Sequence, residues 1–238
     1  MKATKPMLFE AERIDAEYRV EFSPPLFSLV PRVASLLEAL HSSLSPRFRV
    51  PLTSLSALPG PSVGEVGARV SLFDGLVHID VTPGYFFVSA EKMITKEDVA
   101  KVQDCIETSL RSVASFAETH KDATQPDKAK VVIKVWLAGP EGAPVVEMLN
   151  SLLSPAIADK FKERTVRPSP SFQLRSNEFD VDITLQQSAL RENGVFASIE
   201  LTVPRGSTFF GVAPTVGAVR AVLVDTMSLI GVELPDNN

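Results

Sequence analysis

Three carboxylates, Glu178, Asp180 and Asp182, stand at alternate positions in the stretch EFDVD. Alternate side chains of a β-strand point to one face, so all three would lie together there. Convergent carboxylate oxygens are ligands that Mg²⁺ and Ca²⁺ prefer. The intervening Phe179 and Val181 are apolar, however, which is typical of a half-buried strand with one face in water. Because no metal-binding motif accompanies the carboxylates, we favour the water-facing interpretation and expect no metal site.

Two further groups have side chains capable of acid–base or nucleophilic chemistry. His78 and Asp80 share one strand face and could act as a general acid and base, but no G-x-S-x-G nucleophile motif accompanies them. Cys105 has acidic neighbours, Asp104 and Glu107, which disfavour a reactive thiolate. Glycine-rich phosphate-binding loops of both common types are absent from the sequence. We therefore expect no catalytic residue and no cofactor, and the sequence favours a protein that is not an enzyme.

A basic cluster in the stretch DKFKERTVRP is the candidate anion-binding site. Its cations are interrupted by two acidic residues, so a solvated surface is the simpler interpretation. The alternative is contact with a phosphate or an acidic partner. The anion-binding candidates are Lys160, Lys162, Arg164 and Arg167.

Aromatic residues are the other candidates for a binding surface. GYFFV and TFFGV precede the second helix expected in each half of the chain. Adjacent rings in a strand point to opposite faces, so at least one ring of each stretch faces away from the main core. Such a ring could contact a helix, a ligand pocket between the halves or a partner chain. The ligand or interface candidates are Tyr85, Phe86, Trp136, Phe209 and Phe210.

The expected secondary structure comes from periodicity and from turn chemistry. Thr95 and Asp98 resemble a helix capping box, and Asp74-Gly75 predicts a two-residue hairpin turn. The expected strands are 18–22, two strands flanking 74–75, one starting at 85, 131–137, one long strand over 172–186, and 195–204. The expected helices are 33–45 (ended by Pro46), 96–117, 145–155, and 215–231, the last with Thr215 as N-cap and Gly231 as C-cap.

The chain repeats itself. LLEALHSSLSP, residues 36–46, and VVEMLNSLLSP, residues 145–155, are identical at six of eleven positions. IDVTPGYFF, residues 79–87, is similar to IELTVPRGSTFF, residues 199–210. Two similarities in the same order predict a duplicated unit. The fold class is therefore α+β, with two tandem β-α-β-β-α repeats and mainly antiparallel sheet in a pseudo-two-fold arrangement, through either one merged sheet or two facing sheets.

The domain boundaries follow from that duplication. We expect an N-terminal extension over 1–14, a first repeat over 15–119, a polar linker over 120–129 and a second repeat over 130–238. The stretch from Arg47 to Gly64 contains three prolines and several apolar residues. It is long for a connection inside a compact domain, so we expect an edge strand around Phe48–Leu52, a flap over a cleft or a docking segment.

Composition excludes several classes of protein. The net charge is −5, and residues 1–119 carry 12 basic and 15 acidic residues against 12 and 14 in the rest, so neither half is a basic nucleic-acid-binding module. A single cysteine excludes an internal disulfide, and three histidines leave little for a zinc site. No apolar run has the length of a signal peptide or a membrane span. We expect a cytoplasmic protein that binds neither nucleic acid nor membrane.

The helix from Val216 to Ile230 points towards association. Its only charged residues are Arg220 and Asp225, so it lies either in the middle of the fold or under a partner. The leading hypothesis is a non-enzymatic binding or assembly protein that contacts a protein partner or forms a homo-oligomer. The alternatives are a small-molecule binding protein or enzyme with an apolar cleft between the repeats, and a toxin-neutralising or defence-associated bacterial partner protein.

Overall fold

The chain folds into an α+β structure, seen in a computed structural model that describes residues 7–60, 62–153, 169–208 and 210–234. A nine-stranded antiparallel sheet is its main element, and a two-stranded parallel sheet joins the two ends of the chain. The strands are β1 Met7–Leu8, β2 Glu10–Ser23, β3 Leu55–Leu58, β4 Gly67–Leu72, β5 Val77–Val81, β6 Tyr85–Met93, β7 Gln125–Ala138, β8 Ser171–Arg175, β9 Asp180–Gln187, β10 Gly194–Pro204 and β11 Val232–Glu233. The α-helices are α1 Val33–Phe48, α2 Lys96–Thr119, α3 Val145–Asn150 and α5 Val212–Leu229; the 3-10 helices are η1 Phe27–Arg32, η2 Leu52–Ser54 and η3 Phe73–Gly75.

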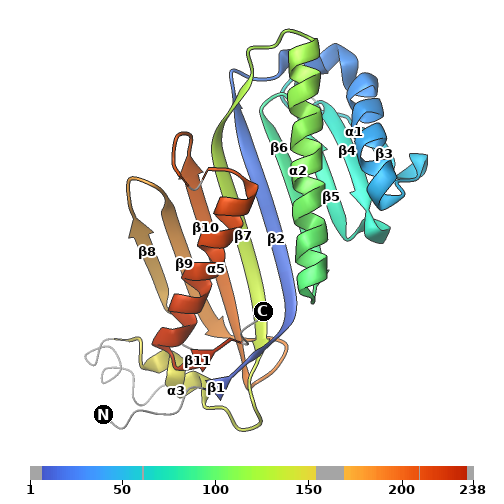
Figure 1. The fold of residues 1–238 in the computed structure, drawn as a ribbon. Coiled ribbons are helices and arrows are strands. Elements are labelled where there is room, and N and C mark those ends of the chain that lie inside the picture. The colour runs from blue at the N-terminus through green and yellow to red at the C-terminus, as the bar shows by residue number, and fades with distance from the viewer. Residues whose placement is uncertain (1–6, 61, 154–168, 209, 235–238) are drawn as a thin grey trace.

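The two longest strands, β2 and β7, pair at the centre of the large sheet and merge the two halves of the chain into one sheet. The strand order is β3-β4-β5-β6-β2-β7-β10-β9-β8. Helices α1, α2 and α5 lie on one face of this sheet (Figure 1). We call the opposite face, onto which none of these three helices packs, the open face.

The alternation of side chains along each strand explains this layering. In β2, Tyr18 and Val20 are buried on the helix side, whereas Arg19 and Glu21 are exposed on the open face. The predicted strand of 18–22 is therefore confirmed, and it extends over 14 residues. A strand that packs helices on one face and meets water on the other shows this period of two.

Helix α1 has one apolar stripe, as predicted. Leu36, Leu40 and Leu44 are fully buried, at intervals of four residues that place them on one side of a helix. The prediction that Pro46 ends the helix is wrong, because α1 continues to Phe48. A proline so close to the end removes only one of the last backbone hydrogen bonds, and the helix ends at Arg49, which has φ 52°.

The capping box of α2 is confirmed. The Thr95 hydroxyl accepts a hydrogen bond from the Asp98 amide at 3.2 Å, and the Asp98 carboxylate accepts one from the Thr95 amide at 3.0 Å. The corresponding prediction for α5 is wrong. Thr215 lies inside that helix and donates its hydroxyl proton to the carbonyl of Gly211, which precedes the first turn. The C-cap of α5 is Ile230, and the predicted C-cap Gly231 follows it by one residue with φ 72°.

One predicted turn and one predicted strand differ in the structure. The hairpin between β4 and β5 exists, but residues 73–76 connect it instead of a two-residue turn, and Phe73, Asp74 and Gly75 all have positive φ. The long strand expected over 172–186 is a hairpin of β8 and β9. Ser176 turns the chain there, because its hydroxyl donates to the Phe179 carbonyl and accepts from the Phe179 amide. Among the described residues, four strands (β3 to β6) follow the first helix of the first half and three (β8 to β10) follow that of the second half, whereas the predicted β-α-β-β-α unit has two.

Two predicted connections also have regular structure. Strand β7 begins at Gln125, within the stretch 120–129 expected as a linker. In the proline-rich stretch, β3 forms an edge strand on β4, a few residues after the position expected for it. Phe48 packs edge-on against Phe73 with 6.0 Å between ring centroids. The second-half helix expected over 145–155 is seen as α3, which is shorter and ends at Asn150; residues 154 and 155 lie outside the described residues.

Candidate functional site

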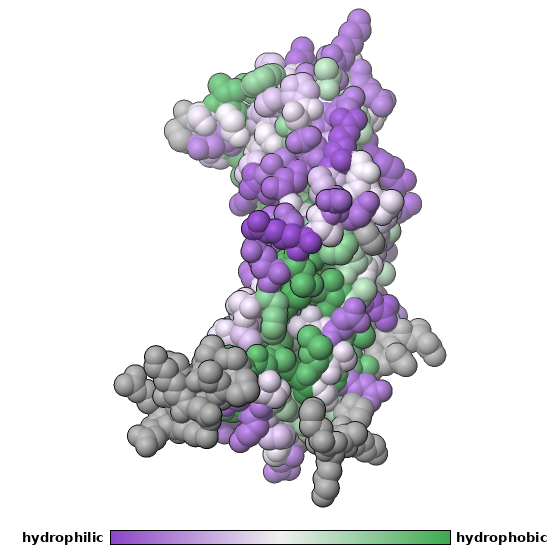
Figure 2. All heavy atoms as spheres, turned by 90° about the vertical axis from the view of Figure 1, so that its left-hand side faces the viewer, coloured by the Kyte–Doolittle hydropathy of each residue, from purple (hydrophilic) through white to green (hydrophobic). Residues whose placement is uncertain are grey.

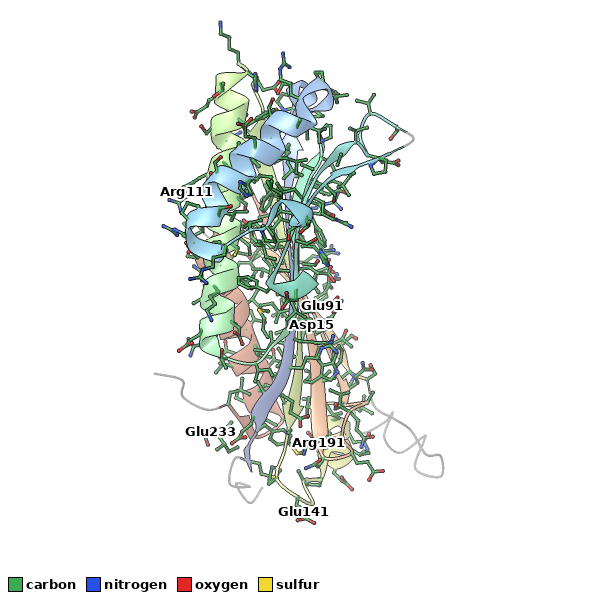
Figure 3. All side chains as sticks on the ribbon, turned by 90° about the vertical axis from the view of Figure 1, so that its right-hand side faces the viewer. Asp15, Glu91, Arg111, Glu141, Arg191 and Glu233 are labelled. Carbon is green, nitrogen blue, oxygen red and sulfur yellow. The ribbon has the colours of Figure 1, made fainter. Side chains whose placement is uncertain are left out.

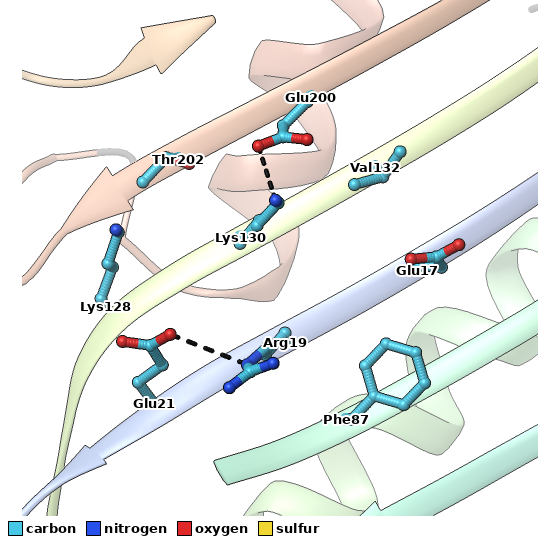
Figure 4. Close-up of a pocket in the computed structure, with 9 residues that line it drawn as sticks. All are labelled: Glu17, Arg19, Glu21, Phe87, Lys128, Lys130, Val132, Glu200 and Thr202. Atoms are coloured by element: carbon cyan, nitrogen blue, oxygen red, sulfur yellow. Dashed lines mark ion pairs between the residues drawn. The ribbon is translucent and has the colours of Figure 1, made fainter. Parts of the chain in front are cut away.

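The centre of the open face has a shallow hollow of about 330 Å³ over β6, β2, β7 and β10 (Figure 4). The register across these strands aligns the side chains that form it: Arg19 stands opposite Lys130 on one side and Phe87 on the other. We call this the central hollow. Its lining residues are Glu17, Arg19, Glu21, Phe87, Lys128, Lys130, Val132, Glu200 and Thr202.

Ion pairs neutralise most of the charge in the central hollow. Lys130 Nζ lies 2.6 Å from a Glu200 oxygen, and Arg19 Nε lies 3.7 Å from a Glu21 oxygen (Figure 4). Lys128 forms no ion pair with any described residue. These side chains are more than a third exposed, so the pairs contribute little to folding stability. The charged groups stay at the surface.

Two aromatic rings, Tyr85 of β6 and Trp136 of β7, lie beyond opposite ends of the central hollow, and each contacts an arginine of β2. The Arg19 guanidinium lies 4.3 Å from the centroid of the Tyr85 ring, and the Arg13 guanidinium lies 4.9 Å from that of Trp136. Trp136 also packs against Phe196 at 4.9 Å. Six residues of strand separate the two arginines, or about 20 Å at 3.3 Å per residue. The two rings therefore form two separate anchors on one face.

Asp15 holds the arginine that covers Trp136. Arg13 donates two hydrogen bonds to its carboxylate, at 2.9 and 2.6 Å, and the Lys92 amide donates a third at 2.8 Å. Burial acts to raise the pKa of Asp15, but the Arg13 and Lys92 hydrogen bonds outweigh it and the pKa is lowered. Asp15 and Glu91 lie next to each other at the waist of the molecule (Figure 3). Arg13 therefore keeps a fixed ion pair at the surface.

The structure separates the predicted aromatic candidates. Tyr85 and Trp136 are on the open face, whereas Phe86 is fully buried and Phe210 packs against the core. Phe209 lies outside the described residues. The described residues that line the central hollow include neither Tyr85 nor Trp136, so the two do not share one apolar cleft. The predicted anion-binding residues Lys160, Lys162, Arg164 and Arg167 also lie outside the described residues.

The three carboxylates of EFDVD do not converge. Glu178 lies in the turn before β9 and accepts hydrogen bonds from the Ser207 hydroxyl at 2.8 Å and the Thr208 amide at 3.0 Å, which lower its pKa. Asp182 accepts a hydrogen bond from Gln173 at 2.8 Å. In the described parts of the chain, no three His, Cys, Asp or Glu side chains are placed to hold a metal ion.

The remaining reactive groups are engaged or buried. His78 Nδ1 lies 3.0 Å from the Ser71 hydroxyl, and Asp80 accepts two hydrogen bonds of 2.6 Å from Arg69. Cys105 is fully buried, and burial raises the pKa of its thiol to about 12. Its thiol therefore stays protonated at neutral pH.

Sequence reasoning missed the arginines and lysines of the open face. The signal lay in the alternation of charge along two strands, in RIDAEYRVE for β2 and in DKAKVVIK for β7. Each stretch alone predicts only a strand with one face in water. Only the pairing of β2 with β7 brings Arg13 opposite Trp136.

No protein-family model matches this chain, and no curated protein matches it.

Proposed function

We propose that this protein is a non-enzymatic binding or assembly protein whose partner protein docks on the open face of the nine-stranded sheet. The observation that carries the proposal is the pair of partly exposed aromatic–arginine anchors, Trp136 with Arg13 and Tyr85 with Arg19, on either side of the central hollow. Tryptophan, tyrosine and arginine are the residues that dominate binding energy at protein interfaces.

The state of the titratable groups supports the same proposal. A general base or nucleophile needs a free, suitably charged atom within reach of a substrate. Asp80 is held by Arg69, and the Cys105 thiol is buried and protonated. The central hollow is open and its charges are largely paired. Such a surface suits contact with another protein better than covalent chemistry.

We infer an internal duplication from the layout of the sheet. Outward from β2 the strands follow as β6, β5 and β4, and outward from β7 they follow as β10, β9 and β8. Helix α2 follows the hairpin of β5 and β6 and packs on β6, and α5 follows the hairpin of β9 and β10 and packs on β10. Leu40 and Leu149, from the two similar stretches of sequence, are both fully buried. This layout supports a pseudo-two-fold axis between β2 and β7. The open face would then be assembled from the same strands of each copy.

A small-molecule site is the second candidate, because the central hollow lies where the two halves meet. Its lining contains three basic and three acidic side chains, in place of the apolar residues expected from the sequence. A ligand there would be small, polar and charged, held by groups such as Lys128 and Thr202. Metabolites co-purifying with the protein would distinguish this candidate from a partner protein.

The proposal is tested by isolating the native protein from its own cells and analysing the eluate for proteins and for small molecules. The variant Trp136→Ala/Tyr85→Ala removes both anchors, and Phe27→Ala removes an exposed ring from η1 and is the matched control. We expect a partner that is retained by the wild type and the control and is lost from the double variant. Retention of every protein by the double variant, or enrichment of a metabolite alone, contradicts the proposal.

A further inference from the structure

Helix α5 is apolar on nearly every side, yet only a third of its residues are buried. It lies on the surface of the helix layer (Figure 1), and its outer side includes Val224, 46% exposed, and Leu229, 65% exposed. Figure 2 looks at the side of the molecule that holds β8 and α5, and hydrophobic side chains gather in the lower half of that view. Of the two arrangements expected from sequence, burial in the middle of the fold is therefore wrong, and cover by a partner stays a prediction.

The exposed side of α5 has the spacing of a helix-pairing seam. Gly217, Ala221, Val224 and Ser228 follow one another at intervals of four, three and four residues. This is the a/d spacing of two helices that pack along their length, and the small residues allow close approach. All four residues are exposed. A Cβ added at Gly217 would meet no atom within 4 Å, so the space beside this glycine is open.

The only two charged residues of α5 flank this seam on opposite sides. Arg220 and Asp225 are exposed, and neither forms an ion pair with a described residue. Within one helix they cannot meet, because residues five apart do not face each other. In the a/d frame they occupy the g and e positions, whose side chains pair across two parallel helices.

We propose that α5 packs in parallel against α5 of a second copy of this chain, related by a two-fold axis along the helices. Arg220 of each copy then meets Asp225 of the other, once on each side of the seam. A two-fold interface must be self-complementary, and opposite charges on opposite flanks provide this. An antiparallel pair would instead bring arginine to arginine and aspartate to aspartate.

The same two charges argue against a lipid bilayer as the cover for this surface. By length and composition alone, α5 could span a membrane. Burial of Arg220 and Asp225 in lipid without partners is strongly unfavourable, whereas the proposed pair neutralises both at the edge of a protein contact. A second copy therefore fits the outer side of α5 better.

The dimer should be of modest affinity. A helix of 18 residues is about 27 Å long, which covers less than the roughly 800 Å² per partner of a standard interface. The oligomeric state of the protein should therefore depend on its concentration in the micromolar range. The seam is on the helix side of the sheet, so this proposal stands or falls separately from partner binding on the open face.

Charge reversal tests the proposal, with sedimentation over about 1 µM to 1 mM protein as the readout. Arg220→Asp and Asp225→Arg should each raise the dissociation constant about tenfold or more. The double variant should restore dimers, and an equimolar mixture of the two single variants should form heterodimers. Arg111→Asp, on the exposed side of α2, is the matched control and should dimerise like the wild type.

Covalent trapping tests the geometry without relying on charge. Ala221→Cys places a thiol on the seam, and mild oxidation with oxidised glutathione should cross-link it to its counterpart in the parallel dimer. The native Cys105 is buried, and Ala114→Cys on the exposed side of α2 is the control. Any of four results overturns the proposal. They are a wild-type protein that is still monomeric at 1 mM, equal cross-linking of the two cysteine variants, failure of the mixed charge-reversal variants to form heterodimers, and flotation of monomers with phosphatidylglycerol vesicles.

Discussion

Replacement of Arg13 by alanine tests whether the anchor at Trp136 is held as the structure shows. Arg13 makes the two hydrogen bonds to Asp15 and lies over the Trp136 ring. Its third contact, with Glu91 at 4.0 Å, joins side chains that are 33% and 60% exposed and contributes almost nothing. The substitution therefore removes one ion pair and one cation–π contact.

The expected loss of unfolding free energy is about 1–2 kcal/mol. A bidentate pair at a partly exposed site contributes about 0.5–1 kcal/mol after solvent screening, and an exposed cation–π contact contributes a similar amount. For a chain of this length, each kcal/mol corresponds to a shift of roughly 2–4 °C in Tm. Arg13→Lys keeps the charge but loses the bidentate geometry, so it should lose about half as much.

Trp136 is the only tryptophan of the chain, so its fluorescence reports on this anchor alone. Urea unfolding followed by fluorescence and circular dichroism measures the free energy, and acrylamide quenching measures the exposure of the ring. Quenching should increase in Arg13→Ala. Arg175→Ala, an exposed strand arginine on the same face, is the control and should change neither quantity by a measurable amount.

Acid should reduce the difference in stability between the wild type and Arg13→Ala to the share contributed by the cation–π contact. The pKa of Asp15 is lowered in the folded protein, so its stabilising contribution is present above its unfolded pKa of about 3.9 and is lost as the pH falls through the folded pKa. The ion-pair share of the difference should be complete at pH 6 and shrink below pH 4. If Arg13→Ala matches the wild type in stability and quenching at pH 6, the described anchor is wrong.

Three further predictions concern the core, the thiol and metal binding. Leu40→Ala and Leu149→Ala should each reduce the free energy of unfolding by about 2–5 kcal/mol in urea titrations, because both side chains are fully buried; a loss under 1 kcal/mol at either site would contradict its placement. Cys105 should react with Ellman's reagent only after denaturation, since its thiol is buried with a pKa of about 12; rapid labelling of the native protein would show that α2 opens readily. EDTA should leave Tm unchanged, whereas a drop of several degrees that Mg²⁺ or Ca²⁺ reverses would restore Asp180 and Asp182 as metal ligands.

Local patterns in the sequence predicted most elements of the fold. The alternation around Tyr18, the leucine stripe ending at Leu44 and the Thr95–Asp98 capping box each depend on neighbours within a few residues, and all three appear as expected. The errors occurred where local rules compete. Pro46 is tolerated in the last turn of α1, and Ser176 breaks a run of strand-forming residues by binding its own backbone.

The candidate site was beyond the reach of such patterns. Arg13 and Trp136 form a unit only through the register of β2 on β7, and the sequence contains no signal for a register between strands so far apart. The sequence also could not predict the exposure of α5, because an apolar helix has the same residue pattern whether its own chain or another molecule covers it. Tertiary pairing decided both features.

The central pairing of β2 with β7 has a consequence for how this protein is made. Lys134 and Glu17, which join the two strands by a hydrogen bond of 3.0 Å, are 117 positions apart in the chain. At about 5–20 residues per second, synthesis of that interval takes roughly 6–23 s, during which β2 lacks its partner β7. The nascent first half thus has a long unpaired strand edge, the kind of surface that promotes wrong association. A truncated chain that ends at residue 119 should therefore aggregate, and co-expressed residues 120–238 should rescue it by providing β7.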